Sequence, residues 1–299
     1  MNNESFESDI VILGHVAKDI IEVDGIKSTS LGGGVYYGGI AGSQIGLKIT
    51  VITRLNQEDF NILNVFKKNK VNVFAYPSEE TSGLRNIYSS NNMEFRDYKP
   101  LGFAGLFRSN EIPDSLKTKF FVISSILAGE VDLELLDFIK KKYPHKTCLD
   151  MQGFIRFSKE GKVFYDSISG KEKKEIISKI NVLKLDQTEA ETLTGQKNIT
   201  RAVKEIFGFG PKEILITHEG GIFLFTLKDT YHFPWKNKNS IGRTGRGDTA
   251  FISYLGKRIT QSPEDSLKFA AALTSLKLEK SGPFNLPLSQ VENLIKREY

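Results

Sequence analysis

The sequence predicts an α/β fold, a doubly wound and mostly parallel sheet flanked by helices, with a small β-sheet lid. Short runs rich in Val and Ile alternate with segments of helical period, which is the pattern of repeated β-α-β units. The runs near the middle of the chain are apolar throughout, as a sheet covered on both faces requires. Two polar stretches of alternating pattern interrupt this rhythm and predict the lid.

The elements follow in order along the chain. The apolar runs predict strands at residues 9–14, 50–53, 120–124, 147–150, 182–185, 213–217 and 222–225. The helical patterns cover residues 37–47, 58–68, 133–143, 172–180, 200–207, 247–259 and 263–279. Residues 18–34 and 82–98 are too polar for a core sheet, so we expect them to form the lid over the ends of the main strands. The whole chain, 1–299, is then a single domain.

The bulk composition restricts the class of protein. A chain of 299 residues with 39% hydrophobic and 26% charged residues is typical of one large globular domain. The net charge of +5 suits an anionic substrate, and the scattered basic residues do not indicate nucleic acid. Cys148 is the only cysteine, so no internal disulfide can form, which favours the cytoplasm. No apolar run approaches the ~20 residues of a membrane helix.

The sharpest motif is a glycine loop, Gly242-Arg243-Thr244-Gly245-Arg246-Gly247-Asp248-Thr249, which opens a predicted helix. Backbone N–H groups at such a turn, beside the positive end of a helix dipole, bind phosphate. The spacing is close to that of a P-loop, but Asp248 stands where the lysine would be, so the P-loop interpretation fails. A carboxylate there suits a general base, with the N–H groups of Gly245, Arg246 and Gly247 holding the transferred phosphoryl group. The alternative is a glycine-rich turn in which Asp248 only caps the helix.

At this point the sequence resembles the ribokinase-like (PfkB) family of carbohydrate kinases over nearly its whole length. The resemblance rests on ordered motifs: Gly32-Gly33-Gly34 before a small-residue helix, Asp186-Gln187-Thr188-Glu189, Thr217-His218-Glu219-Gly220-Gly221, and the loop from Gly242 to Asp248. It implies a ribokinase-like fold, ATP and Mg²⁺ as cofactors, and a sugar, polyol or nucleoside as the acceptor of the γ-phosphoryl group. It also makes a homodimer through the lid possible, without nucleic acid or membrane partners.

The resemblance assigns roles to individual residues. It makes Asp248 the catalytic base and Gly245, Arg246 and Gly247 the anion hole. It places Asp19, Gly32 and Gly33 at the acceptor, Glu189 at magnesium-bound water, and Thr217 and Gly221 near the nucleotide. Arg243 and Thr244 in the loop, and Asp186 ahead of the magnesium acid, complete the expected cofactor site.

Three departures from the family pattern affect this expectation. Gly242 replaces the first Asp of the loop signature, Arg246 replaces its Ala, and Asp186 replaces the Asn of the N-x-x-E motif. The backbone N–H of Arg246 remains a hydrogen-bond donor despite the change. Either Arg243 or Arg246 is a candidate clamp on the phosphates, and the alternative is a surface arginine turned to solvent. Tyr37 stands where an acceptor-binding Asn is usual, and it is either a pocket residue or a core aromatic.

The stretch from Gly14 to Asp19, the stretch from Gln152 to Arg156 and the unusual glycine loop together look similar to the branch of this family associated with myo-inositol kinases. Asp19, Gln152 and Arg156 are candidates for polar contacts to a polyol, with loop solvation as the alternative for the last two. We therefore expect an ATP-dependent polyol kinase, best matched to myo-inositol. A sugar or nucleoside kinase of the same family and a non-catalytic binding protein are the alternatives.

Overall fold

The computed structural model describes residues 6–299, and for residues 92–96 it describes the backbone only. Its largest sheet has nine strands in the order β15-β14-β13-β12-β9-β8-β1-β4-β5. Every pair from β13 to β5 is parallel, whereas β14 and β15 are antiparallel additions at one edge. The strands are β1 (Phe6–Leu13), β4 (Ile49–Asn56), β5 (Asn72–Ser78), β8 (Leu116–Ile123), β9 (Thr147–Asp150), β12 (Val182–Asp186), β13 (Glu213–His218), β14 (Gly221–Thr226) and β15 (Thr230–Pro234).

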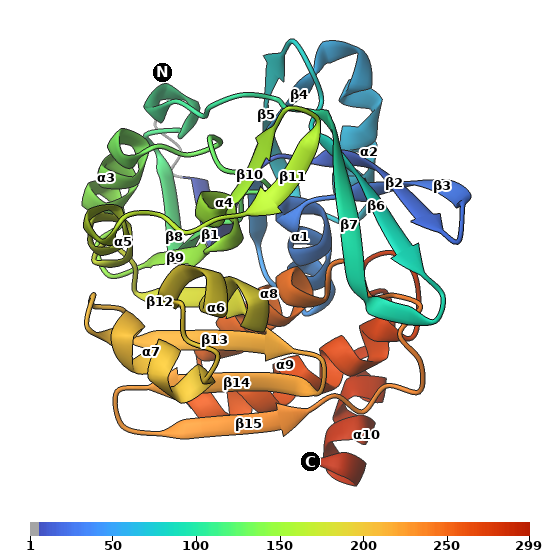
Figure 1. Ribbon diagram of the computed structural model, residues 1–299, viewed down its shortest axis with the longest axis vertical. Helices are drawn as coiled ribbons and strands as arrows, with labels where there is room; N and C mark the ends of the chain where they lie inside the picture. Colours follow the sequence, from blue (N-terminus) through green and yellow to red (C-terminus); the bar gives the residue numbers. More distant parts are fainter. Residues whose placement is uncertain (1–5) are drawn as a thin grey trace.

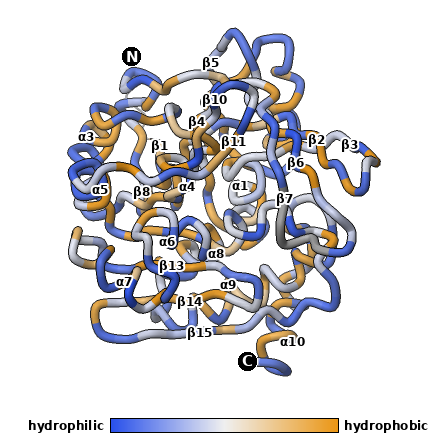
Figure 2. Tube along the Cα trace, in the orientation of Figure 1, coloured by the Kyte–Doolittle hydropathy of each residue, from blue (hydrophilic) through white to orange (hydrophobic). Residues whose placement is uncertain are grey.

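Helices cover both faces of this sheet, as Figure 1 shows. One layer packs on one face and comprises α1 (Gly34–Gln44), α2 (Asn64–Lys68), α8 (Arg246–Arg258), α9 (Pro263–Leu278) and α10 (Leu288–Glu298). The other layer comprises α3 (Leu133–Lys142), α4 (Gln152–Ile155), α5 (Gly170–Ile177), α6 (Gln187–Thr194) and α7 (Ile199–Phe207). The apolar colouring in Figure 2 runs along the central strands, which are therefore buried from both sides.

A separate four-stranded sheet, order β3-β2-β6-β7, lies beside the main body. Its strands are β2 (Ala17–Val23), β3 (Ile26–Gly32), β6 (Gly83–Ser89) and β7 (Asn92–Gly102). The predicted ribokinase-like α/β fold with a large, mostly parallel sheet and a small separate one is therefore confirmed. A short hairpin of β10 (Arg156–Lys159) and β11 (Lys162–Tyr165) faces this smaller sheet across a cleft described below.

The structure differs from the predicted elements in a few places. The predicted helix at 58–68 is a 3-10 turn at Gln57–Leu63 followed by one short helix, α2, because Asn56 caps the turn through the backbone N–H of Glu58 and no long apolar stripe extends it. The sequence analysis missed β5, β15, α6, α10 and the β10–β11 hairpin. The missed strands and α6 are short or at an edge, so their apolar patterns are weak, whereas α10 has 11 residues with a buried face at Val291 and Leu294 and could have been predicted.

Candidate active site

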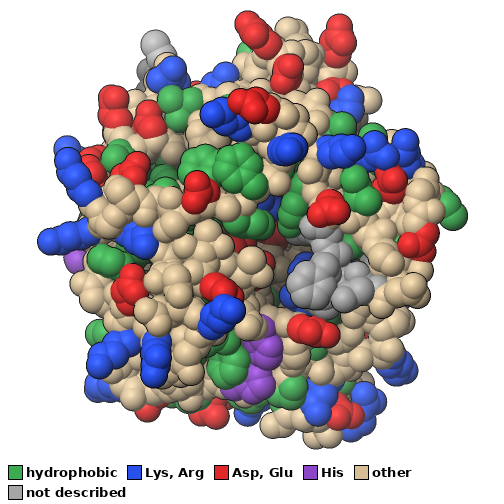
Figure 3. Space-filling view, viewed as in Figure 1, with side chains coloured by type: hydrophobic (Ala, Val, Ile, Leu, Met, Phe, Trp, Pro, Cys, Tyr) green, Lys and Arg blue, Asp and Glu red, His purple; other side chains and the backbone are tan. Residues whose placement is uncertain are grey.

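A cleft of about 1130 Å³ lies at the carboxyl ends of the parallel strands. Its walls are β6 and β7 of the small sheet, the β10–β11 hairpin, the start of α6 and the end of β13. The face drawn in Figure 3 is hollowed near its middle, with acidic and basic side chains around the hollow. A deeper pocket of about 40 Å³ shares Tyr165, Asp186, Thr217, Arg243 and Arg246 with the cleft and reaches Asp248. Ligands of open parallel sheets bind at this edge.

The glycine loop forms the floor of the deeper pocket. Gly245 precedes α8 with φ +81°, a conformation that L side chains rarely adopt, and Arg246, Gly247 and Asp248 form the first turn of the helix. All four residues line the pocket. Arg246 N donates to Arg243 O at 3.3 Å, whereas the N–H groups of Gly247 and Asp248 have no partner within the helix, so this turn offers them to an anion at the positive end of the dipole.

Asp248 meets the start of α1, which comes from the other end of the chain. A Cβ at Gly34 would lie 2.9 Å from Asp248 Oδ1 and 1.8 Å from Ser124 Oγ, so only glycine fits between them. Gly33 has φ +90°, and a Cβ there would lie 2.3 Å from the carbonyl oxygen of His15. The triglycine therefore lets the backbone of one segment come close to the carboxylate of another.

Asp19 stands on the small-sheet side of the same region. It lies on β2, is 7% exposed, and its Oδ1 accepts a hydrogen bond of 2.8 Å from the backbone N–H of Leu84. A Cβ at Gly32 would lie 2.0 Å from Asp19 Oδ2, so this carboxylate too depends on a neighbouring glycine. The structure thus brings Asp19 and the glycines at 32–34 together, as the sequence analysis expected.

A buried ionic cluster lies on the opposite wall of the pocket. Lys184, on β12, donates to Asp150 Oδ1 and Oδ2 at 3.1 and 2.9 Å, and its Nζ lies 3.7 Å from Glu189 Oε2. Burial lowers the pKa of Lys184, but Asp150 and Glu189 raise it further, and the net shift is upward. Lys184 is therefore a cation, and it also lies against Gly247, where a Cβ would be 3.0 Å from its Nζ.

Asp186 and Glu189 form a reciprocal cap at the start of α6. Glu189 N donates to Asp186 Oδ1 at 2.8 Å, and Asp186 N donates to Glu189 Oε2 at 2.7 Å. Burial raises the pKa of Glu189 to about 8, with Asp186 adding to the rise and Lys184 opposing it. Among the residues that the structure describes, no group of three or more His, Cys, Asp or Glu is arranged to hold a metal directly. Oxygen ligands on a pocket wall still fit Mg²⁺ held through water, which this ion retains readily.

The remaining predicted residues divide into two groups. Gln152 and Thr217 line the deeper pocket, and Gln152 Nε2 donates to Ser125 O at 3.1 Å. Thr244 shares a hydrogen bond of 2.9 Å with the hydroxyl of Tyr88 on β6, so the small sheet touches the glycine loop. Thr244, Asp19, Gly32 and Gly33 line neither of the two pockets described here, and the same is true of the last three predicted residues, Tyr37, Arg156 and Gly221.

Each of these three has a different neighbour. The ring of Tyr37 is buried behind the loop, where a Cβ at Gly245 would lie 2.2 Å from its Cγ. Arg156 is buried and its Nε donates to Ile126 O at 2.7 Å. Gly221 pairs with Pro234 between β14 and β15. These placements favour packing contacts, and the ligand contacts expected of the three residues remain predictions.

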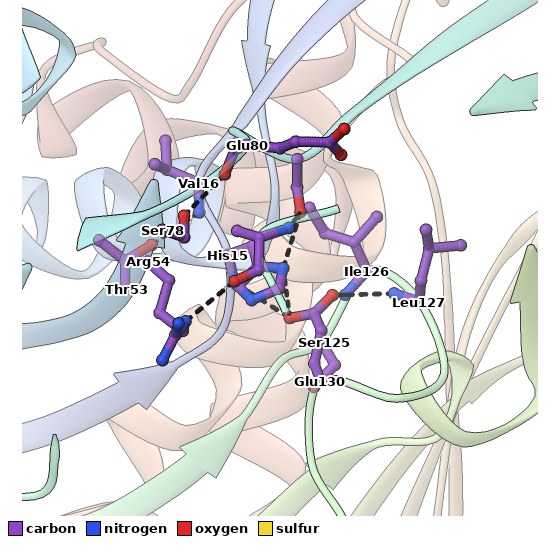
Figure 4. Close-up of polar contacts among 12 residues, drawn as sticks. His15, Val16, Thr53, Arg54, Ser78, Glu80, Ser125, Ile126, Leu127 and Glu130 are labelled. Carbon is purple, nitrogen blue, oxygen red and sulfur yellow. Dashed lines mark hydrogen bonds and ion pairs between the residues drawn. The ribbon is translucent and has the colours of Figure 1, made fainter. Parts of the chain in front are cut away.

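His15 and Glu130 hold the corner between β1 and β2, as Figure 4 shows. Glu130 is fully buried and accepts the backbone N–H groups of His15, Ile126 and Leu127 at 3.1, 2.6 and 2.9 Å. Burial lowers the pKa of His15 to about 3, so the ring is neutral, and its Nδ1 shares a hydrogen bond of 2.7 Å with Ser82. Ser82 immediately precedes β6, so this corner ties the small sheet to the body.

Two lysines of the site escaped the sequence analysis. Lys184 lies in an otherwise apolar strand, and Lys277 lies on the buried face of α9 behind the glycine loop. The available signal was a lysine at a position where the strand or helix pattern requires an apolar side chain, because a buried ammonium must have partners.

A helix N-terminus carrying a carboxylate, at the ligand-binding edge of a ribokinase-like sheet, defines a phosphotransferase with a hydroxyl group as acceptor. The chain belongs to the pfkB family of carbohydrate kinases, whose family model matches residues 11–290. The resemblance found in the sequence is therefore confirmed.

Similar proteins refine this family assignment. A solved structure of a pyrophosphate-dependent kinase in the ribokinase family, complexed with a pyrophosphate analog and myo-inositol, has a TM-score of 0.86 and 30% identity, covering 95% of this chain and 99% of its own. A second solved structure, of a pyrophosphate-dependent myo-inositol-1 kinase converted into a myo-inositol-3 kinase, has the same score and identity over 97% of this chain and 99% of its own. A cytidine kinase from Thermococcus kodakarensis is 26% identical over 257 residues, 83% of this chain and 87% of the relative. No helix among the described residues is long and apolar enough to cross a membrane.

Proposed function

We propose that this kinase phosphorylates a hydroxyl of a polyol, with myo-inositol as the first candidate. The observation that carries the proposal is the close approach of Asp248 to position 34, where a Cβ would lie 2.9 Å from its Oδ1, so that a carboxylate lies between the triglycine and the anion-binding turn of α8. The two similar myo-inositol kinases named above, each matched over nearly the whole chain, support the choice of acceptor.

The reaction follows from this placement. The acceptor hydroxyl lies between Asp19 and Asp248, and Asp248 takes its proton as the oxygen attacks the terminal phosphorus of the donor. A new P–O bond to the acceptor forms, and the bond to the leaving phosphate breaks and its electron pair stays with that phosphate. The N–H groups of Gly245, Arg246 and Gly247 bind the equatorial oxygens, where negative charge spreads in the transition state.

Cations on the donor side balance the charge of the phosphates. Lys184, Arg243 and Arg246 line the deeper pocket, and we assign them to the donor phosphates. Asp186 and Glu189 would hold Mg²⁺ through water, which supplies additional charge neutralisation when bound. The buried Asp150 keeps Lys184 charged and fixes its position, so removal of Asp150 would leave a misplaced cation.

The donor itself is the next part of the proposal, and two candidates have specific support. Pyrophosphate is favoured because three basic side chains, Lys184, Arg243 and Arg246, meet in the small deeper pocket, and because the similar myo-inositol kinases are named as pyrophosphate-dependent. ATP, which the sequence analysis predicted, is supported by the size of the outer cleft and by the apolar Phe164 on its rim, which is 40% exposed. We place pyrophosphate first.

The test is a matrix of donors and acceptors. Purified protein is incubated with Mg²⁺ and either pyrophosphate or ATP, against myo-inositol, ribose, fructose, glucose and cytidine, and ³¹P NMR identifies the phosphorylated product. Turnover of myo-inositol with pyrophosphate, releasing orthophosphate, supports both parts of the proposal. Turnover with ATP alone retains the acceptor and rejects the donor, whereas selective turnover of cytidine or a sugar rejects the acceptor.

We further propose that the small sheet acts as a lid over the site and that two such sheets pair in a homodimer. We also propose that the protein works in the cytoplasm. Tyr88 already contacts the glycine loop through Thr244, and β3 is an edge strand whose Ile26 is 79% exposed. Light scattering on the wild type and on Ile26→Lys tests the dimer: a lower mass for the variant supports it. A wild type of about 34 kDa, the mass of one 33.6 kDa chain, contradicts it.

A further inference from the structure

The side chain of Lys277 is a buried cation directly behind the glycine loop. Lys277 lies in the last turn of α9 and is 2% exposed. Its Nζ contacts the carbonyl oxygens of Gly242 and Thr244 and lies 5.0 Å from the centre of the Tyr37 ring. Among the residues that the structure describes, no carboxylate lies within ion-pair distance of it. A buried charge held only by carbonyls and a ring is costly, so it requires an explanation.

The carbonyl contacts determine which way the loop presents its N–H groups. In a planar trans peptide the C=O and the N–H point in opposite directions. The Thr244 carbonyl points inward to Lys277, so the N–H of Gly245 points outward, toward the pocket that Gly245 lines. The ring of Tyr37 packs against Gly245 from behind. Lys277 therefore fixes the peptide that begins the anion-binding turn.

The same geometry explains why residue 242 is glycine. A Cβ at position 242 would lie 2.0 Å from the carbonyl oxygen of Lys280 and 2.5 Å from that of Lys277, and Gly242 N donates to Leu278 O at 2.7 Å. The end of α9 thus packs directly against the backbone of the loop at this position. The two loop carbonyls of Gly242 and Thr244 attract a cation, and the chain supplies one from Lys277.

We propose that Lys277 is a positioning residue for phosphoryl transfer, an internal ammonium that takes the place of a bound monovalent cation and holds the anion-binding turn in its active form. The proposal rests on phosphoryl transfer at this loop, but on neither the donor nor the acceptor assigned above. It requires that the wild type needs no K⁺ or NH₄⁺, and that loss of the ammonium creates such a need.

Two environmental effects act on the charge of Lys277. Burial lowers its pKa, to about 7, with Arg243 and Arg246 acting in the same direction and Asp248 opposing them. The carbonyl oxygens only accept hydrogen bonds, so they favour the charged form. Assays are therefore run on the acid side of neutrality, at pH 6.5, and Lys277→Arg keeps the charge at every pH used.

The experiment compares monovalent salts at one ionic strength. Turnover is measured in tetramethylammonium, potassium and ammonium chloride for the wild type, Lys277→Ala, Lys277→Met and Lys277→Arg. The control is Lys257→Met, which removes a lysine that also lies over an aromatic ring, 4.2 Å from the centre of Phe269, but at the opposite end of α8 from the anion-binding turn. Thermal melting checks that each variant is folded.

We expect Lys277→Ala and Lys277→Met to lower kcat roughly 10²-fold in tetramethylammonium, the usual effect of losing one oxyanion contact, with the acceptor KM little changed. Ammonium or potassium should restore Lys277→Ala at least about tenfold, and Lys277→Met, whose side chain fills the space, much less. The wild type, Lys277→Arg and Lys257→Met should respond to neither salt.

Three results overturn the proposal: a wild type stimulated by potassium or ammonium, wild-type turnover by Lys277→Met, or a folded Lys277→Ala that no salt restores. If Lys277→Ala does not fold, the wild type still tests the proposal, because stimulation of its turnover by potassium or ammonium would contradict it. If the wild type shows no turnover with any pair of donor and acceptor, the proposed function is rejected, and the role of Lys277 is then tested by binding alone. Calorimetric binding of methylenediphosphonate then tests the loop: weaker binding by Lys277→Met supports the proposal, and equal binding rejects it.

Discussion

At the scale of single residues, the proposed reacting centre depends on glycines that make room for other side chains. Gly32 accommodates Asp19, Gly34 accommodates Asp248, and Gly245 accommodates Tyr37. The sequence showed Asp248 and its loop because a glycine run before a helix has a direct physical meaning. It did not show Lys184 or Lys277, because their roles depend on strands and helices that only the folded chain brings to the loop.

Asp248→Asn tests the proposed base. The amide keeps the shape of the side chain but cannot take the proton, so we expect turnover to fall by roughly 10²–10⁴-fold with little change in donor affinity. Steady-state kinetics together with calorimetric donor binding measure the two effects. Wild-type turnover in the variant would remove Asp248 from this role.

Gly34→Ala tests the close approach of the backbone to the base. The added methyl group would meet Ser124 Oγ and Asp248 Oδ1, so Asp248 must move, and we expect kcat to fall by roughly 10²-fold. The matched control is Gly170→Ala, at the start of α5, where a Cβ meets nothing within 4 Å. Equal activity of the two variants would show that the contact at position 34 does not matter for turnover.

At the scale of elements, the hydrogen bond between Tyr88 of β6 and Thr244 joins the small sheet to the glycine loop. The polar alternation of residues 18–34 and 82–98 predicted that this sheet is separate from the core. It could not predict which strand reaches the loop, because alternation shows which side chains share one face of a strand but not which segment that face contacts. The β10–β11 hairpin, which forms another cleft wall, has too few apolar residues for its pattern to be seen.

Tyr88→Phe removes this bond while keeping the ring. A net hydrogen bond is worth about 0.5–1.5 kcal/mol, so we expect the acceptor KM to rise by roughly 2–10-fold while the melting temperature changes little. A double-mutant cycle with Thr244→Val isolates the pair, because the two single effects should not add. Additive effects of the two substitutions would contradict a direct role for this contact in closure.

At the scale of the whole molecule, the stability of the fold should depend on pH through Glu130. Burial raises its pKa from 4.5 to about 7, while three backbone N–H groups and Arg156 lower it. The folded state therefore binds a proton that the unfolded state has released between these values, so this contribution to stability is full below pH 4.5 and is lost as the pH rises through 7.

The whole shift corresponds to about 3 kcal/mol in the free energy of unfolding, of which about 2 kcal/mol should be lost between pH 5.5 and 8.0. Urea titrations at pH 5.5 and 8.0 should show that Glu130→Gln, which has no proton to lose, is less sensitive to this change than the wild type. The same pH dependence in both proteins would mean that Glu130 keeps one protonation state across this range.

The order of the strands was also beyond the sequence. Alternating strands and helices predict parallel β-α-β units, but the antiparallel β14 and β15 at the edge follow from hairpin pairings that the apolar runs do not reveal. The general position of the site was predictable, because any parallel sheet binds ligands at the same edge.

The proposed acceptor residues and the proposed donor residues come from opposite halves of the chain. The proposed acceptor residues Asp19 and Gly32–Gly34, with the small sheet, precede residue 103, whereas the proposed donor residues Lys184, Arg243 and Arg246 follow residue 183. Recombination between relatives within residues 103–146 would therefore exchange Asp19, Gly32–Gly34 and the small sheet, and would keep the donor residues together with Asp150, Gln152 and the β10–β11 hairpin. In a lineage that diversifies in this way, acceptor preference and donor preference are inherited as separate traits, and Asp248 is the heritable link between them.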